Sequence, residues 1–120
     1  MKSVIENMNK FLEQRKSEVL EEAARLIADE KKDESNFLKA KANIYDVFKA
    51  LLGASYKAAC NDKNAFYADF KKMAQTVPAA WRKSLEEAKR HEDTQKILIE
   101  EAKLSAADEI IAKFDELMEM

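Results

Sequence analysis

The chain has 120 residues, 37% of them charged, and a formal net charge of only −2. One domain with a single core is expected at this length, and the mixed charges give no general attraction for nucleic acid or for an anionic membrane. With one glycine and one proline, the chain lacks the turn residues that multi-stranded sheets require. We therefore expect an all-α fold, formed as one domain over residues 1–120.

The first predicted helix begins at Ser3, which forms a capping box with Glu6, and runs to about Lys32. Arg15 and Lys16 interrupt its apolar face, and we expect their stems to lie along apolar surface while the charged heads reach water. A short polar joint over residues 31–34 makes the next helix an antiparallel neighbour, capped by Ser35 or Asn36. The positions expected to face inward are Val4, Ile5, Met8, Phe11, Leu12, Val19, Ala23, Leu26 and Ile27.

The most apolar stretch runs from Phe37 to Cys60. At a helical period its apolar side chains cover an arc of roughly 200°, so this helix needs neighbours on several sides and should be central in a bundle. Gly53 falls on its polar side, where it costs about 1 kcal/mol relative to alanine. It marks either a close helix crossing or a slight bend.

A third helix is expected after Asp62, which is a good N-cap. Pro78 lacks an N–H group and disfavours a helical conformation at the preceding residue. The third helix is therefore kinked or split at Pro78, and the sequence favours the split. Its inward stripe before the proline consists of Phe66, Phe70, Met73 and Val77.

Residues 78–118 form either one helix or two. His91-Glu92-Asp93-Thr94 is the candidate joint, with Asp93 or Thr94 as the cap. The apolar residues before and after this joint keep the same helical phase, which favours one helix. A single helix of about 40 residues would, however, be roughly 60 Å long, too long for a compact monomer of this size. We therefore predict an up-down antiparallel four-helix bundle.

The last helix carries two apolar stripes, and one is enough to join a monomeric bundle. The second stripe either flanks another helix of the same core or is a surface that a second chain covers. We predict the latter, a homodimer or a complex with a protein partner, in which Phe114→Asp dissociates the dimer and leaves the helices folded. The predicted interface consists of Leu104, Ala107, Ile111, Phe114 and Met118.

The two C-terminal quarters of the chain differ in charge. Residues 61–90 carry seven basic and four acidic side chains, a net of +3, whereas residues 91–120 carry three basic and nine acidic ones, a net of −6. The two segments either neutralise one another by lying side by side, or the acidic last helix recruits a basic partner.

The residues that usually carry chemistry are few. His91 is the single histidine and Cys60 the single cysteine, so histidine-rich metal sites and an intramolecular disulfide are excluded. Cys60 falls near a helix C-terminus, where the helix dipole disfavours a thiolate. Adjacent carboxylate pairs such as Glu100-Glu101 point about 100° apart on a helix and do not converge on a substrate. We expect no enzyme, no metal and no cofactor.

The remaining function classes are also weakly supported. A helix-turn-helix at residues 50–55 is disfavoured because the helical phase runs through it unbroken. The start MKSVIENMNKF has no apolar signal core, and no apolar run reaches the roughly 20 residues of a membrane span, so a cytoplasmic location is expected. We predict a non-enzymatic protein–protein interaction module. The alternative is a bundle that binds a small, lipid-like apolar ligand in a pocket lined by Tyr45, Phe48, Phe70 and Trp81.

Overall fold

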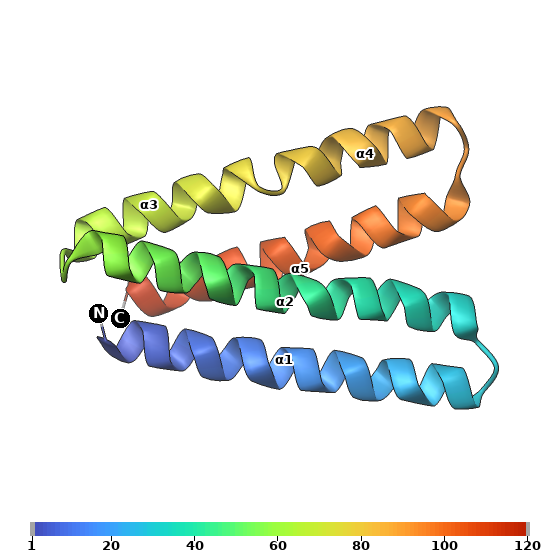
Figure 1. The fold of residues 1–120 in the computed structure, drawn as a ribbon, viewed down its shortest axis with the longest axis horizontal. Coiled ribbons are helices and arrows are strands. Elements are labelled where there is room, and N and C mark those ends of the chain that lie inside the picture. Colours follow the sequence, from blue (N-terminus) through green and yellow to red (C-terminus); the bar gives the residue numbers. More distant parts are fainter. Residues whose placement is uncertain (1, 120) are drawn as a thin grey trace.

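The computed structural model describes residues 2–119 and contains five helices in that range. Helices α3 and α4 follow one another as one rod (Figure 1), so four rods run alternately up and down. This confirms the predicted all-α, up-down four-helix bundle. In chain order the helices are α1 (Lys2–Ala28), α2 (Lys32–Ala59), α3 (Lys63–Thr76), α4 (Ala79–Arg90) and α5 (Thr94–Met118).

The bundle is flattened, with principal extents of 47 × 32 × 20 Å. Helix α2 contacts α1, α3 and α5, and α5 contacts all four other helices, whereas α1 lies next to neither α3 nor α4 within residues 2–119. The parallel helices α2 and α5 therefore meet across the short diagonal of the bundle (Figure 1). This arrangement explains why both helices are apolar over so much of their girth.

The rod formed by α3 and α4 bends only modestly at residues 77–78. Val77 and Pro78 both keep right-handed helical backbone angles. The Val77 amide still donates to the Met73 carbonyl at 2.9 Å, and the Pro78 carbonyl accepts from the Arg82 amide at 3.0 Å. The favoured split is therefore only a two-residue interruption, because proline removes one donor without reversing the chain.

Two of the predicted caps are confirmed. The Asp62 side chain accepts a hydrogen bond from the Ala65 amide at 3.1 Å and caps α3. The Asp93 side chain accepts one from the Lys96 amide at 3.2 Å and caps α5. Residues 78–118 therefore form two helices, and the single long helix is excluded.

The first turn differs from the prediction. Helix α1 ends at Ala28, and Glu30 takes a left-handed conformation with φ 63°. The Lys31 amide donates to the Leu26 carbonyl, and the Glu30 amide donates to the Ile27 carbonyl, which together form a Schellman motif. This motif is made of backbone groups and carries glutamate where glycine is usual, so the sequence did not reveal it.

Four further expectations about α1 and α2 are corrected. Ser3 lies inside α1 and is not its N-cap, and Ser35 lies inside α2, fully buried, while Lys31 occupies the N-cap position without a side-chain bond. Ile27 is exposed, not inward. A Cβ atom added at Gly53 would meet nothing within 4 Å, so Gly53 does not mark a close crossing.

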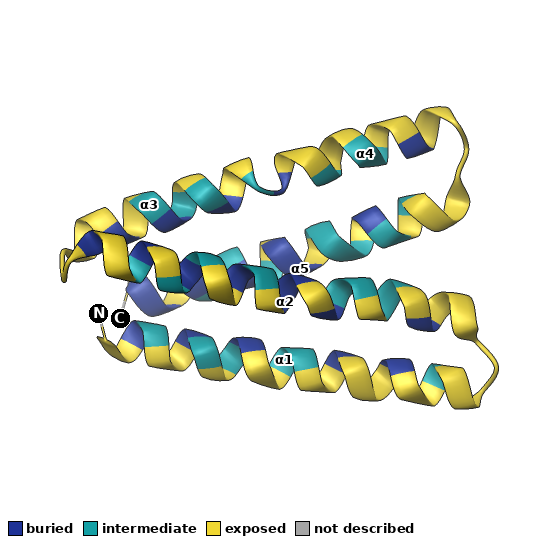
Figure 2. Ribbon diagram, viewed as in Figure 1, coloured by how far each residue is buried: buried dark blue, intermediate teal, exposed yellow. Residues whose placement is uncertain are grey.

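The two halves of the bundle are packed differently (Figure 2). The aromatic half comprises residues 2–15, 44–77 and 108–119, and its buried side chains include five aromatic rings. The alanine half comprises residues 16–43 and 78–107, which contain the turns that join α1 to α2 and α4 to α5. The buried residues of the alanine half are Val19, Ala23, Ser35, Ala42, Pro78, Ala88, Glu100, Ala106 and Ala107.

No helix within residues 2–119 has the length and apolar character needed to cross a membrane.

Candidate functional site

The predicted interface on α5 lies largely inside the core of the single chain. Phe114 is 0% exposed, and its ring centroid lies 4.4 Å from that of Phe70 and 5.4 Å from that of Phe66. Ala107 and Met118 are buried as well, whereas Leu104 and Ile111 are half-buried. The second stripe is used internally because α5 lies on the short diagonal and meets four helices. Phe114→Asp would therefore unfold the chain and not merely separate two copies.

The four rings predicted to line an apolar pocket do come together, but they pack against their neighbours. The centroid of Phe48 lies 6.2 Å from that of Phe70 and 6.4 Å from that of Trp81. Tyr45, Phe48 and Phe70 are buried, and Trp81 packs half-buried at the edge of the core. These rings act as core residues, and none of them lines the pocket described below.

A polar cluster joins α1, α2 and α5 at the boundary between the two halves. Arg15 Nε donates to Glu109 Oε1 at 2.5 Å, and the hydroxyl of the buried Tyr45 lies 3.3 Å from both Glu109 carboxylate oxygens. The bond to Glu109 raises the pKa of Arg15 above its ordinary value. Burial, followed by the charge of Glu109, raises the pKa of Tyr45 to about 12. The cluster fixes the register of three helices.

The charged groups of Arg15 and Lys16 form ion pairs, which corrects the expectation that they simply reach water. Arg15 also pairs with Glu18 at 2.7 Å, and Lys16 pairs with Asp46 on α2 at 2.7 Å. Both side chains are half-buried, so their stems lie along the protein surface as expected.

The acidic last helix also finds its basic partner within the chain. Lys71 on α3 donates to Asp115 on α5 at 2.8 and 3.1 Å. Helices α3 and α4 lie along α5, so the +3 and −6 segments lie side by side and are joined by this ion pair.

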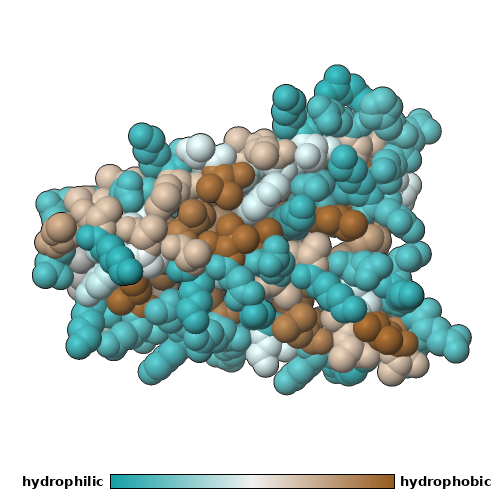
Figure 3. Space-filling model, in the orientation of Figure 1, coloured by the Kyte–Doolittle hydropathy of each residue, from teal (hydrophilic) through white to brown (hydrophobic). Residues whose placement is uncertain are grey.

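The alanine half leaves large apolar side chains poorly covered. Ile27 on α1 is 46% exposed and Leu98 on α5 is 42% exposed, and Leu20 is exposed as well. The space-filling view shows the surface notched between the two turns at this end (Figure 3). Several other large side chains of this half are only half-buried, namely Leu26, Phe37, Leu38, Trp81, Leu85, Ile97, Ile99 and Leu104.

One buried group in the alanine half is charged. Glu100 is 5% exposed, and its Oε1 accepts a hydrogen bond from Lys103 Nζ at 3.3 Å, whereas its Oε2 has no hydrogen-bond partner within the described chain. A buried carboxylate oxygen without a partner destabilises the fold.

The two potentially reactive side chains lie far apart. Cys60 caps the C-terminus of α2 in a left-handed conformation, and His91 caps the C-terminus of α4. The whole rod of α3 and α4 separates them, which corresponds to roughly 40 Å of helix. Cys60 and His91 therefore cannot act together as a nucleophile and its base.

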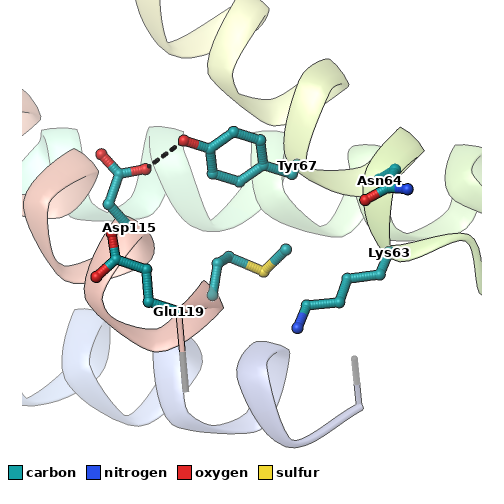
Figure 4. Close-up of a pocket in the computed structure, with 6 residues that line it drawn as sticks. Lys63, Asn64, Tyr67, Asp115 and Glu119 are labelled. Carbon is teal, nitrogen blue, oxygen red and sulfur yellow. Dashed lines mark hydrogen bonds between the residues drawn. The ribbon is translucent and has the colours of Figure 1, made fainter.

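A shallow pocket of about 350 Å³ lies at the end of the aromatic half, between the start of α3 and the end of α5 (Figure 4). Sequence reasoning did not find it, because its polar residues are ordinary helix-surface residues until two helix ends bring them together. Tyr67 is the aromatic residue of the lining, and it is 39% exposed. The pocket is lined by Lys63, Asn64, Tyr67, Asp115, Met118 and Glu119.

Comparison with protein-family models, with curated proteins and with solved structures found no match to this chain. Within residues 2–119, no three histidine, cysteine, aspartate or glutamate side chains gather in a group that could hold a metal ion. The function is therefore argued from the surfaces described above.

Proposed function

We propose that the chain is a non-enzymatic interaction module that forms a homodimer, with the alanine half of one copy packed against the alanine half of the other. The observation that carries this proposal is the exposure of large apolar side chains in that half, above all Ile27 and Leu98. Large exposed apolar side chains mark a protein interface where they form one patch.

A second copy is the occupant that the composition favours. The formal net charge of −2 is small for a chain with 44 charged side chains, so two copies repel one another weakly. A two-fold dimer needs only one self-complementary patch, and each copy supplies the same apolar residues to it.

Binding, and not catalysis, fits the reactive groups of the chain. Cys60 and His91 lie at opposite ends of the α3–α4 rod, and in the adjacent pair Glu100-Glu101 one carboxylate is buried while the other is exposed. A cytoplasmic location fits the free thiol of Cys60, since thiols stay reduced in that compartment.

The proposal is tested by the solution mass, measured with light scattering over a range of concentrations in the presence of a reductant. We expect a mass near twice 13.8 kDa for the wild type. The double variant Ile27→Lys, Leu98→Lys should have the monomer mass with unchanged helical circular dichroism, because both side chains are already exposed in the single chain.

Ala112→Lys is the matched control, since Ala112 lies on an exposed part of α5 in the aromatic half. It introduces one lysine, half of the charge added by the double variant, 14 residues from Leu98, and the dimer should survive it. A monomeric wild type at every concentration, or dissociation of the control as well, would contradict the proposed interface.

A further inference from the structure

The inward faces of α2 and α5 change from apolar to charged at the boundary between the two halves. Lys41 lies about two turns before the buried Phe48 and therefore on the same face of α2. On α5, Lys103 and Glu100 lie about three and four turns before the buried Phe114, again on its face. Charged side chains thus hold core-facing positions on both helices that meet across the short diagonal.

These charged groups lie at nearly the same level along the bundle. Two hydrogen bonds between α2 and α5 join residues that are 62 and 64 positions apart in the sequence. Lys41 lies between the two bonds, so the same offset places it level with Lys103 and about one turn from Glu100. Both lysines are half-buried, and Lys41 forms no ion pair within residues 2–119. Two ammonium groups therefore accompany one carboxylate at this level.

Glu100 is the buried member of this group, and one of its oxygens is free. It is 5% exposed, and its Oε1 lies 3.3 Å from Lys103 Nζ, whereas its Oε2 has no hydrogen-bond partner within residues 2–119. Buried polar side-chain atoms in native proteins nearly always have a partner, and leaving one without a partner costs stability. A hydrogen-bond donor from outside the chain would therefore gain free energy by binding to Oε2.

The alanine half is filled loosely around this level. Trp81 packs at the edge of the main core cluster. Phe37, Leu85 and Leu104 are half-buried, and within residues 2–119 they do not pack against that cluster. Helices α2 and α5 diverge towards this end (Figure 1), and the surface is notched between the two turns (Figure 3). An apolar molecule therefore has side chains to lie against and a way in from the surface.

The charges at this level select the polar group of such a molecule. A cation would meet the like charges of Lys41 and Lys103, and an anion would meet that of Glu100. An anion such as a carboxylate also has no hydrogen to donate to Oε2. A neutral hydroxyl group avoids both repulsions, because it donates a hydrogen bond to Oε2 and accepts one from an ammonium group.

We propose that the alanine half binds a small apolar molecule with one hydroxyl group, such as a substituted phenol, between α2, α4 and α5. The hydroxyl donates to Glu100 Oε2 and accepts from Lys41, and the apolar body lies against Leu85 on α4 and Leu104 on α5. The unpartnered oxygen, which costs the free protein stability, is thus the group that recognises the ligand. This site goes beyond the proposed dimer, because its polar contacts lie inside the single chain.

The test is a titration of para-fluorophenol with the protein, followed by fluorine NMR. We expect a saturable shift of the ligand resonance. The analogue para-fluorotoluene has a methyl group in place of the hydroxyl and should bind about tenfold more weakly or worse, because Oε2 then lacks its donor. The cation para-fluorobenzylamine and the anion para-fluorobenzoate should also bind about tenfold more weakly or worse, because each meets a like charge.

The acceptor is tested by Glu100→Met, which should abolish the preference for para-fluorophenol over para-fluorotoluene. The variant should remain folded, because apolar volume replaces an oxygen that has no partner. Glu101→Met makes the same change at an exposed position of the same helix, and it should leave both affinities unchanged. A Glu100→Met protein that keeps the preference would contradict the assigned acceptor.

The donor to the hydroxyl is tested by Lys41→Met. It should weaken the binding of para-fluorophenol about tenfold and, because a like charge is removed, strengthen the binding of para-fluorobenzylamine. Lys39→Met is the control, since Lys39 is exposed on the same helix, and it should change neither affinity. Equal effects of the two lysine variants would refute the contact with Lys41.

The absence of a saturable shift would overturn the proposal, and so would equal binding of para-fluorophenol and para-fluorotoluene. The double variant Ile27→Lys, Leu98→Lys, which addresses the dimer, should bind para-fluorophenol as the wild type does, because both replaced side chains are exposed. Failure of one proposal is therefore distinguishable from failure of the other.

Discussion

The aromatic half and the alanine half are built from the same rods, yet they are filled with side chains of different size. In the aromatic half, α3 and α5 bring Phe66, Phe70 and Phe114 into contact. In the alanine half, α4 and α5 also lie side by side, but their buried side chains there are the small Ala88, Ala106 and Ala107 and the charged Glu100. A buried phenylalanine stabilises a fold by roughly 1.5–3 kcal/mol through the hydrophobic effect, whereas alanine contributes far less. The helical pattern is thus uniform, and the stability is concentrated in one half.

The largest expected change in the free energy of unfolding is that of Phe114→Ala. Leu104→Ala, on the same helix, is its counterpart in the alanine half. Phe114→Ala should lower the free energy of unfolding by about 3–5 kcal/mol, because the ring is wholly buried and its removal leaves a cavity. Leu104→Ala in the alanine half should cost only about 1–2 kcal/mol, because Leu104 is half-buried. Urea denaturation of both variants measures the difference, and similar losses would show that the halves are equally packed.

A smaller change in the free energy of unfolding, of opposite sign, is expected when Glu100 is replaced. Glu100→Met should raise the free energy of unfolding by about 1–2 kcal/mol, because the unpartnered buried oxygen is replaced by apolar volume. Glu101→Met is the control, since Glu101 is exposed on the same helix and its replacement should change stability little. Destabilisation by Glu100→Met would mean that the carboxylate has a partner in solution.

The smallest effect concerns the boundary between the halves and depends on pH. The folded-state pKa of Tyr45, about 12, exceeds its ordinary value of 10.0 because the hydroxyl is buried beside Glu109. The unfolded chain therefore loses this proton first, so the stabilisation is fully present below pH 10 and is lost as the pH rises through about 12. Tyr45→Phe should flatten this decline in urea titrations, whereas Tyr67→Phe at the exposed ring should not. Equal slopes for both variants would indicate that water reaches Tyr45.

The helix ends were predictable from the sequence where a single capping side chain determines them. Asp62 and Asp93 cap their helices as expected, because a cap depends on a single side chain and the next few amides. The turn after α1 was placed too late, because Glu30 occupies a left-handed position for which glycine is the usual signal.

The candidate sites were less predictable, because they depend on which rods are neighbours. The stripe containing Phe114 looked like a surface for a second chain, and the sequence could not show that α5 lies on the short diagonal of a flattened bundle. The pocket joins Lys63 to Glu119, residues at the ends of two helices that are distant in the sequence. Neither residue belongs to a motif, so only the packed structure brings them together.

Pro78 has a consequence for how the bundle unwinds. It offers no amide to the Ala74 carbonyl, so the ladder of helical hydrogen bonds is interrupted between α3 and α4, at the boundary of the two halves. Unwinding of α4 that begins at the His91 turn would need a new nucleation event to continue past Pro78 into α3. Helix α3 is held in the core by the buried rings of Phe66 and Phe70. The proline thus divides one continuous rod into two units of hydrogen exchange, and amides of α4 should exchange before those of α3.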